Sequence, residues 1–527
     1  MSEAGWPPVR YHGDVRGGYD DVIVGAGSCG AVLAARLSEN PDRRVLLLEA
    51  GPDYRSSAET PPDLVSGWMS LVDHDWGTTA LAVAGRSIPY PRGKVVGGSS
   101  AVNGTIALRG HPADFEEWAT RGLPEWSWPE VFSCYRQLED DPHGASLDPE
   151  VHATDGPVPI DRVTRAHWQP VHAAFHAACL AAGFRDCADF NAPAATGVGV
   201  WPRNTRDGIR MSSALTHLAP ARARPNLEIR SNILVDKVII EAGRAVAVDV
   251  IGEAGHERLA GARITLAAGA LGSPPVLLRS GIGPAAALRA LGIPVVVDRR
   301  GVGARLLDHP AVGVPALARD GVPHDNSVVT QAGLRYTAPR SSEPDDIQMF
   351  AATLFDPALT RSMLGQEVRL FSIGSALVRP RSTGRLTITT PDPTAQPVIQ
   401  LNYLTDPVDV ARLIDAVRLA RDLCRSTELA DVIGPPLIDD AVLHDDDAVT
   451  DMLRSQITTT YHPAGTAPMG PANNDDTVVD GHGRVHGVDR LRVADASIMP
   501  TSVRCNPNLT CLMLAERLAR WMNAEAD

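Results

Sequence analysis

The order of hydrophobic and polar positions predicts a parallel β-sheet near the start of the chain. Residues 19–24 are β-rich, residues 25–30 form a glycine turn, and residues 31–38 carry apolar side chains at helical spacing. Residues 45–48 are continuously apolar, which is typical of a strand in a parallel sheet covered on both faces. The pattern therefore predicts a strand, helix, strand unit of about 30 residues.

Two apolar runs in the middle of the chain predict a β-hairpin. Residues 234–240 and 245–250 flank a Glu-Ala-Gly-Arg turn. Residues 264–270 then indicate a strand that enters a glycine turn, and a helix is expected from Ser273. This order of elements extends the sheet predicted for the first residues.

The second half of the chain mixes strands and helices. Residues 311–459 contain β-type runs such as 384–389, and a helical stretch lies near 408–424. Near the end, a strong helical pattern begins at Leu509, with Asn508 as the expected N-cap. We interpret 311–459 as a second domain.

The composition is that of an ordinary globular protein, because 44% of the 527 residues are hydrophobic and 21% are charged. This length corresponds to three domains' worth of chain or one large two-domain enzyme. The net charge of −14 argues against nucleic acid as the main partner and against docking on an anionic membrane. No apolar run reaches about 18 residues, so no integral membrane segment is expected.

The cysteines indicate a reducing compartment. The seven cysteines are scattered, odd in number and without CxxC spacing. This usage fits reduced, mostly buried thiols, and it favours neither a disulfide framework nor a metal site. The first residues lack a basic segment followed by an apolar run, so no signal peptide is predicted. Together these features predict a cytoplasmic protein.

The glycine turn has the GxGxxG spacing of a dinucleotide-binding motif. Gly25 allows a tight turn, Gly27 lets the backbone approach a pyrophosphate, and Gly30 lets the helix pack on the sheet. The helix N-terminus then faces the anion. Glu49 ends the next strand, where a ribose-binding carboxylate belongs. These residues predict a dinucleotide site, and the local motif leaves NAD and FAD both open.

A long segment rich in glycine, proline and serine follows at residues 52–110. Loops of this length are usually functional. Within it, Gly97-Gly98-Ser99-Ser100 and Asn103-Gly104 combine close backbone approach with hydrogen-bonding side chains. We expect this loop to lie against a ligand.

The stretch TYHPAGT, residues 460–466, holds a histidine in constrained backbone. Pro463 pushes His462 toward extended conformations, and Gly465 permits a turn. Taken alone, such a pattern is more often a structural loop histidine than a catalytic one.

With these motifs together, the chain resembles the glucose–methanol–choline (GMC) family of FAD-dependent oxidoreductases. Three signatures carry the resemblance: residues 22–30 with Glu49-Ala50-Gly51, residues 93–103, and residues 269–284. A C-terminal block also matches: TYHPAGT, residues 493–500, and Asn506-Pro507-Asn508. The resemblance covers residues 19 to 520.

The resemblance implies FAD as the cofactor and no metal. It implies noncovalent binding, because Val102 stands where some choline-oxidising relatives carry a flavin-linked histidine. Glu49 would contact the ADP half, Val235 the adenine, and Asp495-Ala496 the ribityl and pyrophosphate. The implied cofactor-binding residues are Gly25, Ala26, Gly27, Ser28, Gly30, Glu49, Ala50, Trp76, Gly97, Gly98, Ser99, Asn103, Gly104, Thr105, Val235, Tyr461, Asp495, Ala496, Pro507 and Asn508.

His462 and Asn506 match the family's catalytic pair. A neutral histidine can accept the hydroxyl proton of an alcohol while a hydride leaves the carbon, and its ordinary pKa of about 6.5 suits that task. Asn506 would donate a hydrogen bond to the developing alkoxide. The helix from Leu509 would direct its N-terminus at the flavin and stabilise negative charge there. The implied partners are a small-molecule alcohol and an electron acceptor, either oxygen or a quinone or other redox carrier.

The expected fold is α/β, with a discontinuous Rossmann-type FAD-binding domain and an α+β substrate-binding domain that contains an antiparallel sheet. The FAD-binding domain would comprise residues 18–160, 201–310 and 460–527, the last part holding the catalytic residues. The substrate-binding domain would comprise an insertion at 161–200 and the main part at 311–459.

Three other functions remain open at this point. A hydroxynitrile lyase and a fatty-acid photodecarboxylase use the same fold, and an inactive cofactor-binding module would have lost its base. Several residues near the motifs are interpreted as structural: His217, His309 and Cys29, together with Arg504 at the surface. Cys505 is expected to be a buried small side chain.

Overall fold

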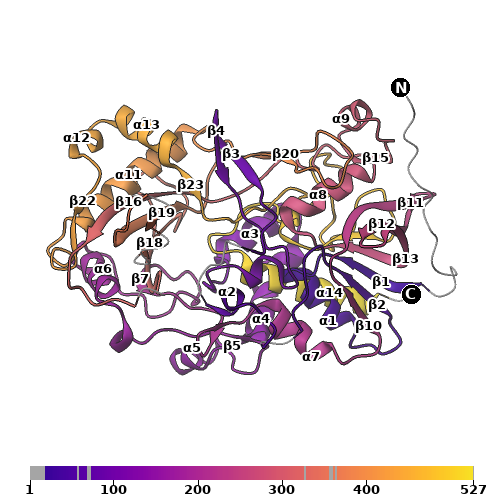
Figure 1. Cartoon of the computed structure of the whole chain (residues 1–527), viewed down its shortest axis with the longest axis horizontal. Helices are drawn as coiled ribbons and strands as arrows, with labels where there is room; N and C mark the ends of the chain where they lie inside the picture. Colours follow the sequence, from indigo (N-terminus) through magenta and orange to yellow (C-terminus); the bar gives the residue numbers. More distant parts are fainter. Residues whose placement is uncertain are drawn as a thin grey trace.

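The computed structural model describes residues 18–55, 58–67, 73–325, 328–354, 360–361 and 365–525. Figure 1 shows two regions at opposite ends of the molecule. One contains the strands next to the predicted dinucleotide-binding turn, and the other contains an antiparallel sheet flanked by helices. Most of the C-terminal helix lies between these two regions.

A seven-stranded sheet forms the first region. Its central strand β1 (Tyr19–Val24) pairs in parallel with β2 (Val45–Leu48) and with β13 (Gly255–Leu266). β10 (Leu227–Arg230) extends the sheet beyond β2, and β24 (Leu491–Val493) pairs with the end of β13. The strands come from distant parts of the chain, which confirms the predicted discontinuous α/β fold.

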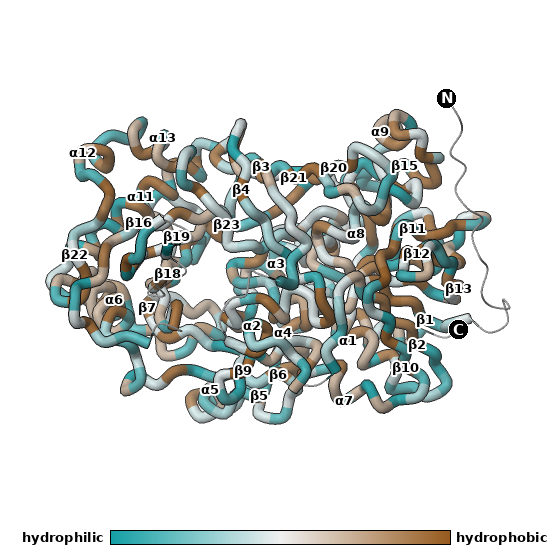
Figure 2. The backbone as a smooth tube through the Cα atoms, viewed as in Figure 1, coloured by the Kyte–Doolittle hydropathy of each residue, from teal (hydrophilic) through white to brown (hydrophobic). Residues whose placement is uncertain are grey.

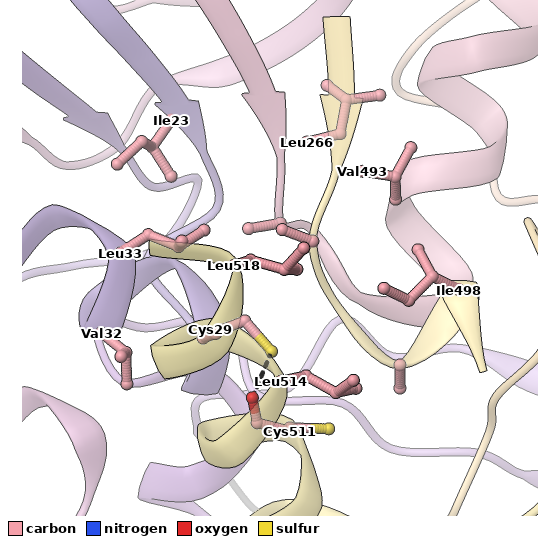
Figure 3. Packing of buried hydrophobic residues seen from close by; sticks show 14 of the residues in the cluster. Ile23, Cys29, Val32, Leu33, Leu266, Val493, Ile498, Cys511, Leu514 and Leu518 are labelled. Carbon is pink, nitrogen blue, oxygen red and sulfur yellow. Dashed lines mark hydrogen bonds between the residues drawn. The ribbon is translucent and has the colours of Figure 1, made fainter. Parts of the chain in front are cut away.

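Two helices from opposite ends of the sequence cover this sheet together. α1 (Ser28–Leu37) packs on α14 (Asn508–Ala524), and Figure 3 shows Cys29, Leu33, Leu514 and Leu518 in their shared apolar layer. The Cys29 thiol donates to the Cys511 carbonyl at 3.2 Å, so it is a small packed side chain as predicted. In Figure 2 hydrophobic segments gather around β1, β2 and α1.

The predicted hairpin is present beside the parallel strands. β11 (Leu234–Glu241) pairs antiparallel with β12 (Arg244–Gly252), which in turn pairs with the first half of β13. The helix expected from Ser273 begins earlier, since α8 spans Gly269–Arg279.

A second seven-stranded sheet forms the other region and is antiparallel where its strands pair. Its order is β22-β16-β19-β18-β17-β7, and β23 pairs with β16. Alternate residues of these strands pack in an apolar core with α6 and α11. The strands are β7 (Gly197–Val200), β16 (Pro310–Ala318), β17 (Ala332–Tyr336), β18 (Ile347–Leu354), β19 (Leu370–Leu377), β22 (Ile433–Pro436) and β23 (Thr458–Thr459), and the helices are α6 (Pro170–Ala181), α11 (Pro407–Cys424) and α13 (Asp446–Gln456).

β7 brings residues of the predicted insertion into this second sheet. The chain also forms a small sheet that the sequence did not suggest. β4 (Arg86–Pro89) pairs with β3 (Thr79–Val83), β3 pairs with β21 (Val398–Gln400), and β21 pairs with β20 (Arg385–Thr387). This sheet joins the early glycine-rich segment to the second half of the chain. The domain boundaries given above stay predictions.

Further helices complete the fold. They are α2 (Pro62–Val65), α3 (Pro112–Thr120), α4 (Trp128–Leu138), α5 (Pro142–Leu147), α7 (Ala219–Ala221), α9 (Ala285–Ala290) and α12 (Asp440–Leu443). Shorter strands are β5 (Glu139–Asp140), β6 (Val158–Pro159), β8 (Thr205–Arg206), β9 (Ile209–Arg210), β14 (Ile282–Gly283) and β15 (Val297–Asp298). Within the described ranges, no helix has the length and apolarity needed to cross a membrane.

Candidate active site

The glycine turn after β1 forms a close-fitting backbone cradle. Gly25 has φ +97°, and a Cβ there would lie 2.6 Å from the carbonyl oxygen of Ala267. Gly27 is the N-cap of α1, and no described side chain caps this helix. A Cβ at Gly98 would lie 2.6 Å from the Cα of Gly27, so the two glycine loops meet. An uncapped helix N-terminus under a glycine cradle suits a pyrophosphate.

Glu49 lies at the end of β2 beside this cradle. Its carboxylate is buried and accepts from the backbone N–H groups of Ala26 at 3.0 Å and Gly51 at 2.9 Å. Burial raises the pKa of Glu49 to about 7, although those two donors oppose the rise. Ribose hydroxyls would add donors and favour the ionised form. The N–H of Ile233 donates to the backbone carbonyl of Glu49 at 2.8 Å, which attaches the segment just before β11 and Val235 to the end of β2.

The second glycine loop is held by a backbone contact with the first loop and by hydrogen bonds of its own side chains. The N–H of Gly97 donates to the Ala26 carbonyl at 2.8 Å, and Ser99 Oγ accepts from the Gly93 N–H at 3.3 Å. Asn103 Oδ1 accepts from the Thr105 N–H at 2.9 Å, next to Gly104. The Thr105 hydroxyl donates to the Gly67 carbonyl at 2.9 Å, so it supports the loop from behind.

The N-terminus of α14 meets that of α1. Ser28 Oγ donates to Asn508 Oδ1 at 2.8 Å. The prediction that Asn508 is the N-cap is wrong: Pro507 occupies that position, and the Asn508 side chain bonds to Ser28 instead. No described side chain caps α14. Two uncapped helix N-termini therefore converge, which favours anionic groups between them.

Asp495 uses its carboxylate inside the chain. It accepts from the Gly269 N–H at 2.9 Å and Ser273 Oγ at 2.6 Å through one oxygen, and from the Ser497 N–H at 2.8 Å through the other. Ala496 follows it, and the Ala496 carbonyl accepts from the Gly465 N–H at 3.0 Å. This places Asp495 and Ala496 next to the TYHPAGT loop.

Two other predicted cofactor residues lie beside these loops. The Lys94 ammonium lies 5.0 Å from the centroid of the Trp76 ring. The backbone N–H of Trp76 donates to the Arg92 carbonyl. Ala50 lies between Glu49 and Gly51. The contacts of Trp76 attach it to the start of the second signature.

His462 and Asn506 face each other across the two loops predicted to be catalytic. Asn506 Nδ2 lies 3.3 Å from His462 Nε2. Because an amide nitrogen only donates, Nε2 is the acceptor and the proton of the neutral ring is on Nδ1. His462 Nδ1 lies 2.9 Å from both Thr460 Oγ1 and His309 Nδ1, and either atom can accept a hydrogen bond from the Nδ1–H group.

Burial keeps this histidine pair uncharged. Desolvation, and then the neighbouring His309 and Arg92, hold the pKa of His462 well below 6.5. Desolvation lowers the pKa of His309 to about 4. Both rings are therefore neutral near pH 7, and His462 presents an unprotonated Nε2 toward Asn506.

His309, interpreted from the sequence as structural, contacts the predicted base, since its ring is edge-on to His462 with centroids 5.0 Å apart. One signal in the sequence could have found it. His309 precedes Pro310 as His462 precedes Pro463. His217, by contrast, lies 3.4 Å from Glu516 and away from this pair, in keeping with a structural role.

The surface position expected for Arg504 is also wrong. Its side chain is 3% exposed and forms ion pairs with Asp114 on α3 and with Glu343, the latter at 2.6 Å. The pairing attaches the loop that carries Asn506 to two other parts of the fold. Cys505 is buried, as predicted, and burial raises its pKa to about 12.

One group of described side chains has metal-ligand geometry: Glu139, Asp141 and His152. Both carboxylates are already paired with buried guanidinium groups. Arg109 pairs with Glu139, and Arg162 pairs with Asp141 at 2.5 Å. These contacts make the group a buried ion network.

The family model described as GMC oxidoreductase matches residues 19–311 and 380–515. The chain belongs to the GMC oxidoreductase family. FAD is the cofactor of this family, and the cradle, Glu49 and the two uncapped helix N-termini fit its pyrophosphate and ribose.

The alignments with relatives of this GMC oxidoreductase cover nearly all of its length. It is 35% identical to the 5-(hydroxymethyl)furfural oxidase of a Methylovorus species, over 95% of this chain and 98% of that protein. It is 33% identical to the oxygen-dependent choline dehydrogenase of Photobacterium profundum, over 95% and 92% of the two chains. The crystal structure of pyridoxine 4-oxidase from Mesorbium loti superposes with a TM-score of 0.87 at 30% identity, covering 97% and 100%.

Proposed function

We propose that this protein oxidises an alcohol to an aldehyde or ketone, with His462 as the base. The observation that supports this proposal is the His462–Asn506 pair, which lies at the uncapped N-terminus of α14. A substrate hydroxyl placed between Nε2 and the amide would donate to the first and accept from the second.

FAD, when bound, supplies the acceptor for the hydride that leaves the carbinol carbon. His462 Nε2 takes the hydroxyl proton, and the Asn506 amide stabilises the oxygen as negative charge develops on it. Asn506 cannot titrate, so His462 carries the proton transfer. The N-terminus of α14 stabilises negative charge next to the site by about 0.3–2 kcal/mol.

The FAD is proposed to be noncovalent. Val102 packs with the apolar side chains of Leu64, Val95 and Ala101, and it offers no atom for a flavin linkage. Acid precipitation of the purified protein should leave all yellow colour in the supernatant. Flavin that stays with the precipitate would contradict this part of the proposal.

The cytoplasm is the proposed compartment, since all seven cysteines are free and buried. Relatives that oxidise 5-(hydroxymethyl)furfural, choline and pyridoxine suggest small alcohols as substrates. Oxygen or another carrier, such as a quinone, is the proposed electron acceptor.

Anaerobic mixing with a panel of these alcohols tests the proposal. A substrate should bleach the absorbance of oxidised flavin, and readmitted oxygen should restore it quickly only in an oxidase. His462→Ala should slow the bleaching by about 10²–10⁴-fold. If no alcohol bleaches the flavin, or if the variant bleaches at the wild-type rate, the proposal is wrong. Turnover without bleaching would indicate a lyase, and activity only in light would indicate a photodecarboxylase.

A further inference from the structure

Asp308 accepts hydrogen bonds from four groups that come from distant parts of the chain. Its Oδ2 accepts from the hydroxyls of Tyr90 at 2.8 Å, Tyr403 at 2.5 Å and Thr459 at 2.6 Å. Its Oδ1 accepts from the backbone N–H of His462 at 2.8 Å. The carboxylate is 4% exposed. It therefore connects the segment after β4, the segment after β21, β23 and the loop of the proposed base.

The residue before His462 is strained. Tyr461 has φ +63°, a left-handed backbone conformation that is strained for a bulky residue and persists only where the surrounding structure imposes it. Its N–H donates to Thr459 Oγ1 at 2.7 Å, and its carbonyl accepts from Arg92 Nη2 at 2.8 Å. The next N–H, that of His462, is the one bound by Asp308. These contacts impose the turn that directs the imidazole toward Asn506.

The partners of Asp308 require a carboxylate, because both of its oxygens accept. An Asn could place its one accepting oxygen at the three hydroxyls or at the His462 N–H, and its amide nitrogen, which only donates, would face the other. Tyr90 and Tyr403 are buried, and burial followed by the charge of Asp308 raises the pKa of both phenols well above the usual range. Both phenols are therefore protonated and donate to the carboxylate.

We propose that Asp308 is a positioning residue: its carboxylate holds the backbone of His462 so that Nε2 faces the substrate hydroxyl. This inference rests on the proposed role of His462 as the base. It predicts that Asp308 influences catalysis only through the placement of that ring. A misplacement of about 1 Å is enough to slow a reaction by about 10²-fold.

A double-mutant cycle on the holoenzyme tests the inference. Asp308→Asn should retain bound FAD and its visible spectrum, yet reduce the flavin about 10²-fold more slowly at saturating alcohol. In a His462→Ala background, Asp308→Asn should cause no further loss, because the group on which it acts is gone. If it slows His462→Ala by the same factor as wild type, Asp308 acts elsewhere and the inference is overturned.

The cycle separates this inference from the proposed function. If His462→Ala alone reduces its flavin at the wild-type rate, His462 is not the base, whatever the result for Asp308→Asn. A slow His462→Ala together with a wild-type Asp308→Asn would refute only the positioning role.

Tyrosine variants keep the test decisive if Asp308→Asn fails to fold. Tyr90→Phe and Tyr403→Phe each remove one donor from Oδ2, and the double variant should approach the loss expected for Asp308→Asn. Tyr336→Phe is the matched control, since its buried hydroxyl has no hydrogen-bond partner in the described part of the chain. If the double variant reduces flavin as fast as Tyr336→Phe, Asp308 does not position His462.

Discussion

At the scale of single residues, the site depends on which ring nitrogen of His462 carries the proton. Asn506 Nδ2 leaves Nε2 as the acceptor, so Nδ1 needs an acceptor of its own. His309 Nδ1 and Thr460 Oγ1 both lie 2.9 Å from it. This arrangement selects the tautomer that a base requires.

A pair of variants at His309 tests this arrangement. The carbonyl oxygen of Asn can replace Nδ1 as an acceptor, whereas Leu cannot accept. His309→Leu should slow flavin reduction by about 10-fold, which corresponds to ~1.4 kcal/mol for one hydrogen bond, and His309→Asn should recover most of the rate. Anaerobic stopped-flow mixing at saturating alcohol measures both. Equal rates for the two variants would show that the acceptor at position 309 is not required.

The sequence was sufficient to predict that His462 and Asn506 form a pair, because both lie in motifs with recognisable neighbours, and the structure brings their side chains together. It was insufficient for His309, which is 153 positions from His462 and carries no local signal beyond its following proline. Arg504 was misplaced for a related reason. An arginine in a polar loop is usually exposed, and only the fold brings Asp114 to it.

At the scale of elements, the cofactor cradle depends on contact between two loops at glycines, where neither loop has a side chain. Gly27 is the N-cap of α1, and Gly98 is the first residue of a 3₁₀ turn. The backbones of these two glycines are in contact. The strand, helix, strand pattern predicted the first loop, because periodicity reports local structure. It could not predict that β3 pairs with β21, because that pairing depends on contacts between distant segments.

Substitution of Gly98 should damage this cradle. Gly98→Ala places a Cβ 2.6 Å from the Gly27 backbone, so the loops must separate. We expect purified Gly98→Ala to contain much less FAD than wild type, measured by the ratio of visible to ultraviolet absorbance. Gly243→Ala is the matched control, because Gly243 also has a positive φ but has no atoms within 4 Å of the added Cβ. Equal FAD content in the two variants would contradict the cradle.

At the scale of the whole molecule, a buried ion network joins Glu139 of β5 and Asp141, the N-cap of α5, to more distant loops. His152 lies 3.0 Å from Glu139 through Nδ1 and 2.8 Å from Asp189 through Nε2. Both partners only accept, so both ring nitrogens must donate and the ring is an imidazolium. Burial lowers the pKa of His152, but the bonds to Asp189 and Glu139 outweigh it and raise the pKa to about 9.

This shift makes stability depend on pH in the alkaline range. The folded protein holds the His152 proton more tightly than the unfolded chain, whose histidine pKa is about 6.5. The contribution to stability is therefore complete below pH 6.5 and is lost as the pH rises through about 9. The melting temperature should fall across this range by more in wild type than in His152→Gln, which lacks the proton at every pH.

Calorimetry between pH 6 and pH 10 measures this difference. His143→Gln, at an exposed position of the nearby helix α5, should keep the wild-type pH dependence. Parallel melting curves for wild type and His152→Gln would show that the network does not bind the extra proton.

The pairing of β24 with β13 and of α14 with α1 has a consequence for biosynthesis. Ser28 and Asn508 are 480 positions apart, yet they meet at the cofactor cradle. Translation of 527 residues takes roughly 30–100 s at ordinary rates. For most of that time α1 has been made but α14 has not. The apolar side chains of α1 that α14 will cover are therefore exposed to the solvent or to a chaperone. We therefore expect the flavin to be captured only after α14 has left the ribosome, when Asn508 can meet Ser28.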